Sequence, residues 1–127
     1  MKQCITSDKL PQAIGPYSQI VVSSGFMFLS GQIPLDPATG NLVEGGIEKQ
    51  TRTVLNAIKT ALQERHLDMS DVVKVTAYLT GPGTFAAFNT VYAGYFTNDP
   101  PVRTTVFVSA LPKGAQVELD VIAALGS

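Results

Sequence analysis

The chain has 127 residues, and 45% of them are apolar, which predicts one folded domain with a substantial hydrophobic core. Nine basic side chains are balanced by ten acidic ones, and the formal net charge is -1. Because Lys and Arg are not clustered anywhere in the sequence, it predicts neither a nucleic-acid-binding surface nor a membrane-binding surface.

The sequence contains one cysteine, Cys4, and one histidine, His66. A single cysteine excludes an internal disulfide, and these two residues are too few for a closed tetrahedral zinc site within one chain. The first ten residues lack the apolar segment of a secretory signal, and no apolar run is long enough to span a bilayer. We therefore expect a soluble, cytoplasmic protein without a bound metal.

His66 lies in the charged segment QERHLD, at the predicted end of a helix. A Ser-His-Asp triad would need this histidine as its base, but no Gly-x-Ser-x-Gly motif is present to supply the nucleophile. Histidines in the last turn of a helix are commonly solvated and interact with the helix dipole. We therefore interpret His66 as an exposed helix-end residue.

The first half of the chain predicts a hairpin followed by a helix. Residues 17–22 and 26–33 are rich in strand-forming side chains and are separated by the turn sequence Ser-Ser-Gly. A further turn over residues 34–41 contains Pro37 and Gly40. Residues 47–65 then predict an amphipathic helix that covers one face of the sheet. Its apolar positions recur at helical spacing: Ile47, Val54, Leu55, Ile58, Ala61 and Leu62.

The second half predicts a strand, a helix and two more strands. Residues 72–79 alternate as a strand, and Gly-Pro-Gly at 81–83 ends it. A second helix follows and ends before the prolines at 100 and 101. Its apolar stripe, which we interpret as core, consists of Phe85, Phe88, Val91, Tyr92 and Tyr95. With strands at 103–110 and 116–124, the expected class is α+β, a mixed sheet with both helices on one face.

The last two strands carry rows of side chains that are only partly apolar. Val117, Leu119, Val121 and Ala123 form an apolar row, whereas the opposite row contains Glu118 and Asp120 beside Ile122 and Ala124. A second mixed row consists of Arg103, Thr105, Phe107 and Ser109. Such rows suit a subunit interface that contains a polar pocket, and they also suit a solvated sheet face.

Arg103 and Glu118 occupy positions where the strand pattern favours core residues. If the last two strands pair as an antiparallel hairpin through residues 111–115, Arg103 lies near one end of its strand and Glu118 nearer the turn. The two side chains then need not be neighbours. Spacing alone therefore leaves both interpretations open, a pair of exposed strand charges or a functional site.

The chain resembles the Rid family, the reactive intermediate or imine deaminases, some of which were also described as translation inhibitors. The resemblance covers residues 10–124, and the marker segments occur in the family order. They are AIGPYSQ (13–19), SGQIPLDPATG (30–40), FNTVYAGYF (88–96), VRTTV (102–106) and LPKGAQVELDVIA (111–123). This resemblance implies a chorismate-mutase-like subunit in a homotrimer with a central barrel-like core, and ligand clefts between neighbouring subunits.

The resemblance also implies roles for the two charged residues. Arg103 would bind the carboxylate of a small 2-imino or 2-aminoalkenoic acid through its planar guanidinium. Glu118 would orient or activate the water that attacks the imine carbon, which gives a 2-oxo acid and ammonium. Because the C=N bond is already electrophilic, no metal and no cofactor are expected.

Five further residues match family positions at the cleft. Tyr17 would close over the substrate and donate a hydrogen bond, and Ser30 and Gly31 would allow the backbone to approach the ligand closely. Asn89 would lie near the cleft. Thr105 replaces the cysteine that many members carry, so a thiol-dependent regulation is not expected here.

Four functions remain open at this point, and one of them, a holdase-like chaperone, leaves no residue signature in the sequence. The first is an imine deaminase that clears intermediates released by pyridoxal-phosphate dehydratases. The second is a non-enzymatic protein that binds 2-oxo acids through Arg103 and acts as a regulator. The third, an endoribonuclease or translation inhibitor, is disfavoured because the sequence has no basic stripe.

Overall fold

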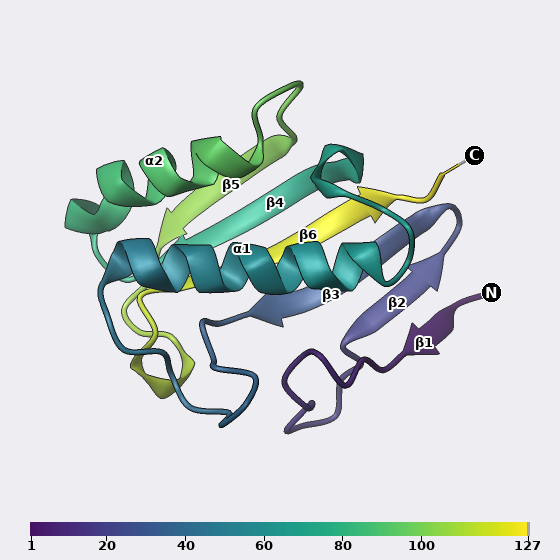
Figure 1. Ribbon diagram of the computed structural model, residues 1–127, viewed down its shortest axis with the longest axis horizontal. Coiled ribbons are helices and arrows are strands. Elements are labelled where there is room, and N and C mark those ends of the chain that lie inside the picture. Colours follow the sequence, from purple (N-terminus) through teal and green to yellow (C-terminus); the bar gives the residue numbers. More distant parts are fainter. Residues whose placement is uncertain (127) are drawn as a thin grey trace.

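In the computed structural model, which describes residues 1–126, two helices lie side by side on one face of a six-stranded sheet (Figure 1). The strands are β1 (Gln3–Ile5), β2 (Ile20–Ser23), β3 (Phe26–Gln32), β4 (Val72–Leu79), β5 (Val102–Phe107) and β6 (Val117–Ala124). The helices are α1 (Ile47–Gln63) and α2 (Phe85–Tyr95), and short 3-10 turns occur at Met69–Asp71, Pro82–Thr84 and Pro112–Gly114. The predicted α+β class with both helices on one face is confirmed. No helix in residues 1–126 is both long enough and apolar enough to cross a bilayer.

The strands are arranged in the order β1-β2-β3-β6-β4-β5, and only β4 and β5 are parallel. The antiparallel hairpin of the last two strands, which sequence analysis considered as one possible pairing, does not form, because β4 lies between β5 and β6. The α2 crossover returns the chain to the β4 edge in the parallel direction, and β6 then pairs with β3 and β4 at once. The central position suits β6, whose alternate residues are buried, whereas β5 has no fully buried residue and lies at the edge.

The core lies between the sheet and the helices. From α1 it receives the predicted apolar stripe, including Val54, Leu55 and Ile58, all fully buried. From β6 it receives Val117, Leu119, Val121 and Ala123. Sequence analysis missed β1, because three mostly exposed edge residues carry no periodic signal.

The two faces of the sheet carry different parts of the predicted mixed rows. Glu118 and Asp120 alternate with the buried β6 row and therefore lie on the face without helices, which we call the open face. Arg103 and Thr105 pair in register with the buried residues Val75 and Ala77 of β4, so they lie on the helix-covered face. Sequence analysis did not predict that the two rows lie on opposite faces, because the edge position of β5 was not visible in its residue pattern.

The C-terminal end of α1 explains the backbone conformation and the exposure of His66. The Leu67 amide donates to the Leu62 carbonyl and the His66 amide donates to the Gln63 carbonyl, at 2.9 and 3.1 Å, which is the Schellman arrangement. His66 occupies its left-handed position, with φ 59°, and its side chain is exposed. Leu67 is buried in the core directly after it. The interpretation of His66 as an exposed helix-end residue is confirmed.

Replacing His66 by glycine should stabilise the fold, because glycine adopts a left-handed φ without steric cost. We expect His66→Gly to raise the free energy of unfolding by about 0.5–1 kcal/mol. Urea denaturation of both proteins measures this difference. A lower free energy of unfolding in the variant would contradict the assignment of the helix end.

Candidate functional site

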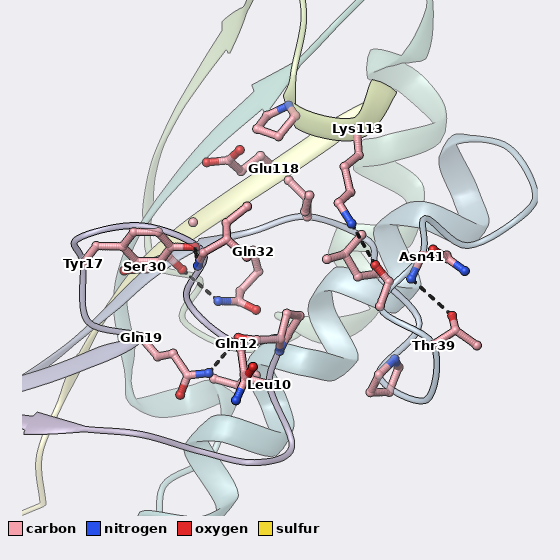
Figure 2. A pocket seen from close by; sticks show the side chains of 18 of the residues that line it. Leu10, Gln12, Tyr17, Gln19, Ser30, Gln32, Thr39, Asn41, Lys113 and Glu118 are labelled. Carbon is pink, nitrogen blue, oxygen red and sulfur yellow. Dashed lines mark hydrogen bonds between the residues drawn. The ribbon is translucent and has the colours of Figure 1, made fainter.

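A cavity of about 790 Å³ opens beside the end of β3, where the N-terminal loop, the loop after β3 and the turn before β6 converge (Figure 2). Its lining includes Tyr17, Ser30, Gly31 and Glu118, which sequence analysis predicted as site residues. Residues from distant segments therefore meet at one place, although their roles toward a ligand stay predictions.

The carboxyl group of Glu118 lies directly against Gly31. A methyl group added at Gly31 would come within 2.9 Å of Cδ of Glu118 and still closer to Oε2. The approach occurs at a bulge, because Leu29 pairs with Val121 and Gln32 with Leu119, which leaves one extra residue on β3. We expected Gly31 to admit a ligand, but in this chain the group that approaches it is the Glu118 side chain.

The surroundings of Glu118 favour its protonated form. Partial burial raises the pKa of the Glu118 carboxyl, and the negative charge of Asp120 raises it further. Asp120 in turn accepts a hydrogen bond of 2.9 Å from the Tyr78 hydroxyl on the neighbouring strand. Glu118 therefore keeps its proton to a higher pH than a free glutamate, as a group that exchanges protons with a substrate requires.

Tyr17 lies at the rim of the cavity on a tight loop. Its amide donates to the Gly15 carbonyl at 2.8 Å, and its hydroxyl accepts a hydrogen bond from the Ile14 amide at 3.4 Å. The side chain is 51% exposed, so the ring is reachable from solvent. Its hydroxyl is held by a neighbouring backbone group and not by the core.

Ser30 connects β3 to the loop that carries Tyr17. Its hydroxyl donates to the Ser18 carbonyl at 2.6 Å, and its amide donates to the Gln19 carbonyl at 2.9 Å. The hydroxyl proton of Ser30 is therefore already engaged within the chain, and its oxygen can still accept a hydrogen bond.

Sequence analysis missed several polar residues that line the cavity. The buried side chain of Gln19 accepts a hydrogen bond from the Ser7 amide and donates one to the Pro11 carbonyl. Gln32 is also buried, and Lys113 donates to the Gly40 carbonyl at 3.0 Å (Figure 2). Polar side chains in loops and at strand ends usually indicate only solvation, so no signal in the sequence separated these residues from exposed ones.

Arg103 lies on the other face of the sheet, against α2. Its guanidinium carbon is 4.7 Å from the ring centre of Tyr92, 5.4 Å from that of Phe88 and 5.8 Å from that of Phe85. These distances are typical of cation–π contacts. The prediction that the α2 stripe is core is confirmed for Phe88 and Tyr92, which are buried, and both rings also contact the guanidinium.

Asn89 and Thr105 lie on the same side of the sheet as Arg103. Asn89 is on α2, four residues after Phe85 and three before Tyr92, so it neighbours both on the helix surface. Thr105 follows Arg103 on the same face of β5. The predicted site residues therefore form two groups in one chain, with Tyr17, Ser30, Gly31 and Glu118 around the cavity and Arg103, Thr105 and Asn89 beside α2.

No group of three His, Cys, Asp or Glu side chains within residues 1–126 is arranged to hold a metal ion. The candidate chemistry of the described residues therefore lies in one carboxyl group, one guanidinium and hydrogen-bonding groups.

Comparison with known proteins identifies the family. The sequence model of the Endoribonuclease L-PSP family matches residues 7–125. The chain belongs to the Rid/L-PSP family. It is 53% identical over 124 residues to Protein DfrA of Myxococcus xanthus, with 96% of this chain and 95% of the relative covered. It is 40% identical over 126 residues to the 2-iminobutanoate/2-iminopropanoate deaminase of Capra hircus, with 99% of this chain and 92% of the relative covered.

A solved structure of a Rid-family protein has the same fold as this chain. The crystal structure of the Rid-family protein YyfA from Yersinia pestis superposes with a TM-score of 0.92 at 46% sequence identity. The superposition covers 98% of this chain and 100% of that one. The resemblance to the Rid family stated from the sequence is confirmed.

Replacing Gly31 by alanine should move the Glu118 carboxyl out of its half-buried position, because the added methyl group would overlap it. Since burial is the main cause of the raised pKa, we expect Gly31→Ala to lower the pKa of Glu118 toward that of a free glutamate. Carbon-13 NMR titration of the glutamate carboxyl groups measures this change.

Gly83→Ala is the matched control, because nothing lies within 4 Å of a methyl group added there. The pKa of Glu118 should stay at its wild-type value in this control. A Gly31→Ala variant with an unchanged Glu118 pKa would show that the carboxyl is not held against residue 31.

Proposed function

We propose that this chain is an imine deaminase that hydrolyses small 2-imino acids, such as 2-iminobutanoate and 2-iminopropanoate, to 2-oxo acids and ammonium. The observation that carries the proposal is the Glu118 carboxyl with its raised pKa, on the wall of a cavity large enough for such a substrate. The relative named 2-iminobutanoate/2-iminopropanoate deaminase, which is 40% identical, supports the same activity.

Glu118 supplies the acid–base chemistry of this reaction. It takes a proton from water as the water oxygen bonds to the imine carbon, and it delivers a proton to the imine nitrogen. The resulting carbinolamine then loses its C–N bond as the hydroxyl proton moves to nitrogen, which leaves the 2-oxo acid. The ammonia released takes a proton from solvent and becomes ammonium.

Arg103 binds the substrate carboxylate. A guanidinium presents two parallel N–H donors to a carboxylate, and an anionic substrate is therefore both held and oriented. Tyr17 and the backbone around Ser30 and Gly31 complete the site from the cavity side, and Thr105 and Asn89 complete it from the Arg103 side. No cofactor takes part in this scheme.

The site requires a second copy of the chain. Arg103 and Glu118 lie on opposite faces of the sheet, so one chain does not present both to the same substrate. The open face exposes apolar side chains that suit burial by another copy, with Phe26 and Phe28 each 40% exposed and Val102 67% exposed. We propose a chorismate-mutase-like homotrimer in which Arg103 of one protomer faces Glu118 of its neighbour.

The test is release of 2-oxo acid from imines generated in the assay by an amino-acid oxidase. We expect wild type to accelerate it and Arg103→Ala and Glu118→Gln each to lose at least about 100-fold in kcat/KM, since a charged hydrogen bond and a proton-transfer group are removed. All proteins are compared at equal oligomer content. Arg52→Ala, at an exposed position on α1, is the matched control and should keep wild-type activity.

Two results would overturn the proposal. Wild type that gives no acceleration over several imines but binds 2-oxo acids would indicate a ligand-binding regulator. Variants at Arg103 and Glu118 that retain full activity would show that the hydrolysis uses other residues.

A further inference from the structure

We propose that Phe85, Phe88 and Tyr92 form an aromatic support that positions the Arg103 guanidinium for the substrate carboxylate. The inference deepens the proposed function and rests on it for the identity of the ligand. It makes these three α2 residues positioning residues that act through Arg103.

The three rings surround one side of the guanidinium. Their centres lie 4.7, 5.4 and 5.8 Å from its central carbon, all within the range of a cation–π contact. They come from positions i, i+3 and i+7 of α2, which share one helix face. A single helix therefore fixes the surface on which the Arg103 side chain lies.

The support is rigid because it is part of the core. Phe88 is fully buried and Tyr92 is 7% exposed. The Tyr92 ring also packs against Phe88 and Phe96, with ring centres 5.4 and 4.6 Å apart, and Phe85 packs against Phe107 of β5 at 6.0 Å. An arginine loses considerable rotamer freedom when it binds a ligand, and a fixed surface beneath it reduces that loss at the moment of binding.

Aromatic rings hold the cation without neutralising it. A carboxylate partner within the chain would occupy the N–H donors of Arg103 and would compete with an anionic substrate. Ring faces attract the positive charge but provide no charged acceptor. A tyrosine is uncharged at neutral pH, and burial raises the pKa of Tyr92 further, to about 12, so this ring adds no negative charge beside Arg103.

The ring of Tyr92, and not its hydroxyl, is the part that acts. The hydroxyl oxygen is buried and makes no hydrogen bond to any residue in the range 1–126. Removing it should therefore leave the contact with Arg103 intact, whereas replacing the ring by an aliphatic chain should remove it.

The experiment compares Tyr92→Phe, Tyr92→Leu and Phe88→Leu in the full chain, by imine turnover and by binding of 2-oxobutanoate. The carboxylate contact exists in both ground and transition states, so its weakening should raise KM with little change in kcat. We expect Tyr92→Leu and Phe88→Leu to raise KM and the dissociation constant roughly 3- to 30-fold, as the loss of a cation–π contact implies. Tyr92→Phe should match wild type.

Phe96→Leu separates this effect from loosening of the core. It removes a buried ring that packs on Tyr92 but is not one of the three beside Arg103. We expect its KM to stay within about 2-fold of wild type, the lower limit of a cation–π contribution. An equal rise of KM in Phe96→Leu, or an equal loss in Tyr92→Phe, would overturn the inference.

If wild type neither turns over imines nor binds 2-oxo acids, the proposed function is overturned, but the contact between Arg103 and the rings is not. An NMR measurement tests that contact directly. The Nε–Hε resonance of Arg103 should show an upfield ring-current shift in wild type and Tyr92→Phe. That shift should diminish in Tyr92→Leu. A wild-type resonance at the position of a solvated arginine would show that the support does not hold Arg103.

Discussion

The central position of β6 is the constraint on which the rest of the structure depends. Because β6 pairs with β3 on one edge and β4 on the other, the alternation of its side chains assigns residues to the two faces of the whole sheet. Val117 and Leu119 enter the core beneath the helices, so Glu118 must point to the open face. A shift of one residue in this register would bury the carboxyl in the core and expose the apolar row.

The same sheet separates the two charges that the proposed function brings together in one site. The guanidinium of Arg103 is on the helix side, held by neutral rings, and the carboxyl of Glu118 is on the open side, partly buried beside Gly31. Within one chain neither charge neutralises the other, so both remain available for the ligand that we propose. A neighbouring copy that brings its own edge strand to the cavity would supply the missing half, and the apolar side chains of the open face would supply the driving force for association.

The sequence was sufficient to predict features set by local spacing. Residues 47–65 and the aromatic stripe after residue 84 predicted both helices, and Ser-Ser-Gly predicted the β2–β3 turn. The order of the strands was not predictable in this way, because the place of β6 between β3 and β4 depends on pairing between distant segments. Gly31 was expected to permit a close approach, but its partner proved to be Glu118, which is 87 residues later in the chain (118 − 31). The buried glutamines of the cavity were missed because their place in its lining depends on which loops converge. Only the folded sheet determines which loops do so.

The most direct test of this account is a subunit-mixing experiment with Arg103→Ala and Glu118→Gln, each inactive alone. If each site takes Arg103 from one protomer and Glu118 from its neighbour, unfolding and reassembly of an equal mixture should restore about a quarter of the wild-type imine hydrolysis per site, as random pairing around a cyclic oligomer requires. The unmixed variants, taken through the same reassembly, should stay inactive. If the mixture reassembles into oligomers and shows no activity above the two variants alone, the site is not shared between chains and the account is contradicted.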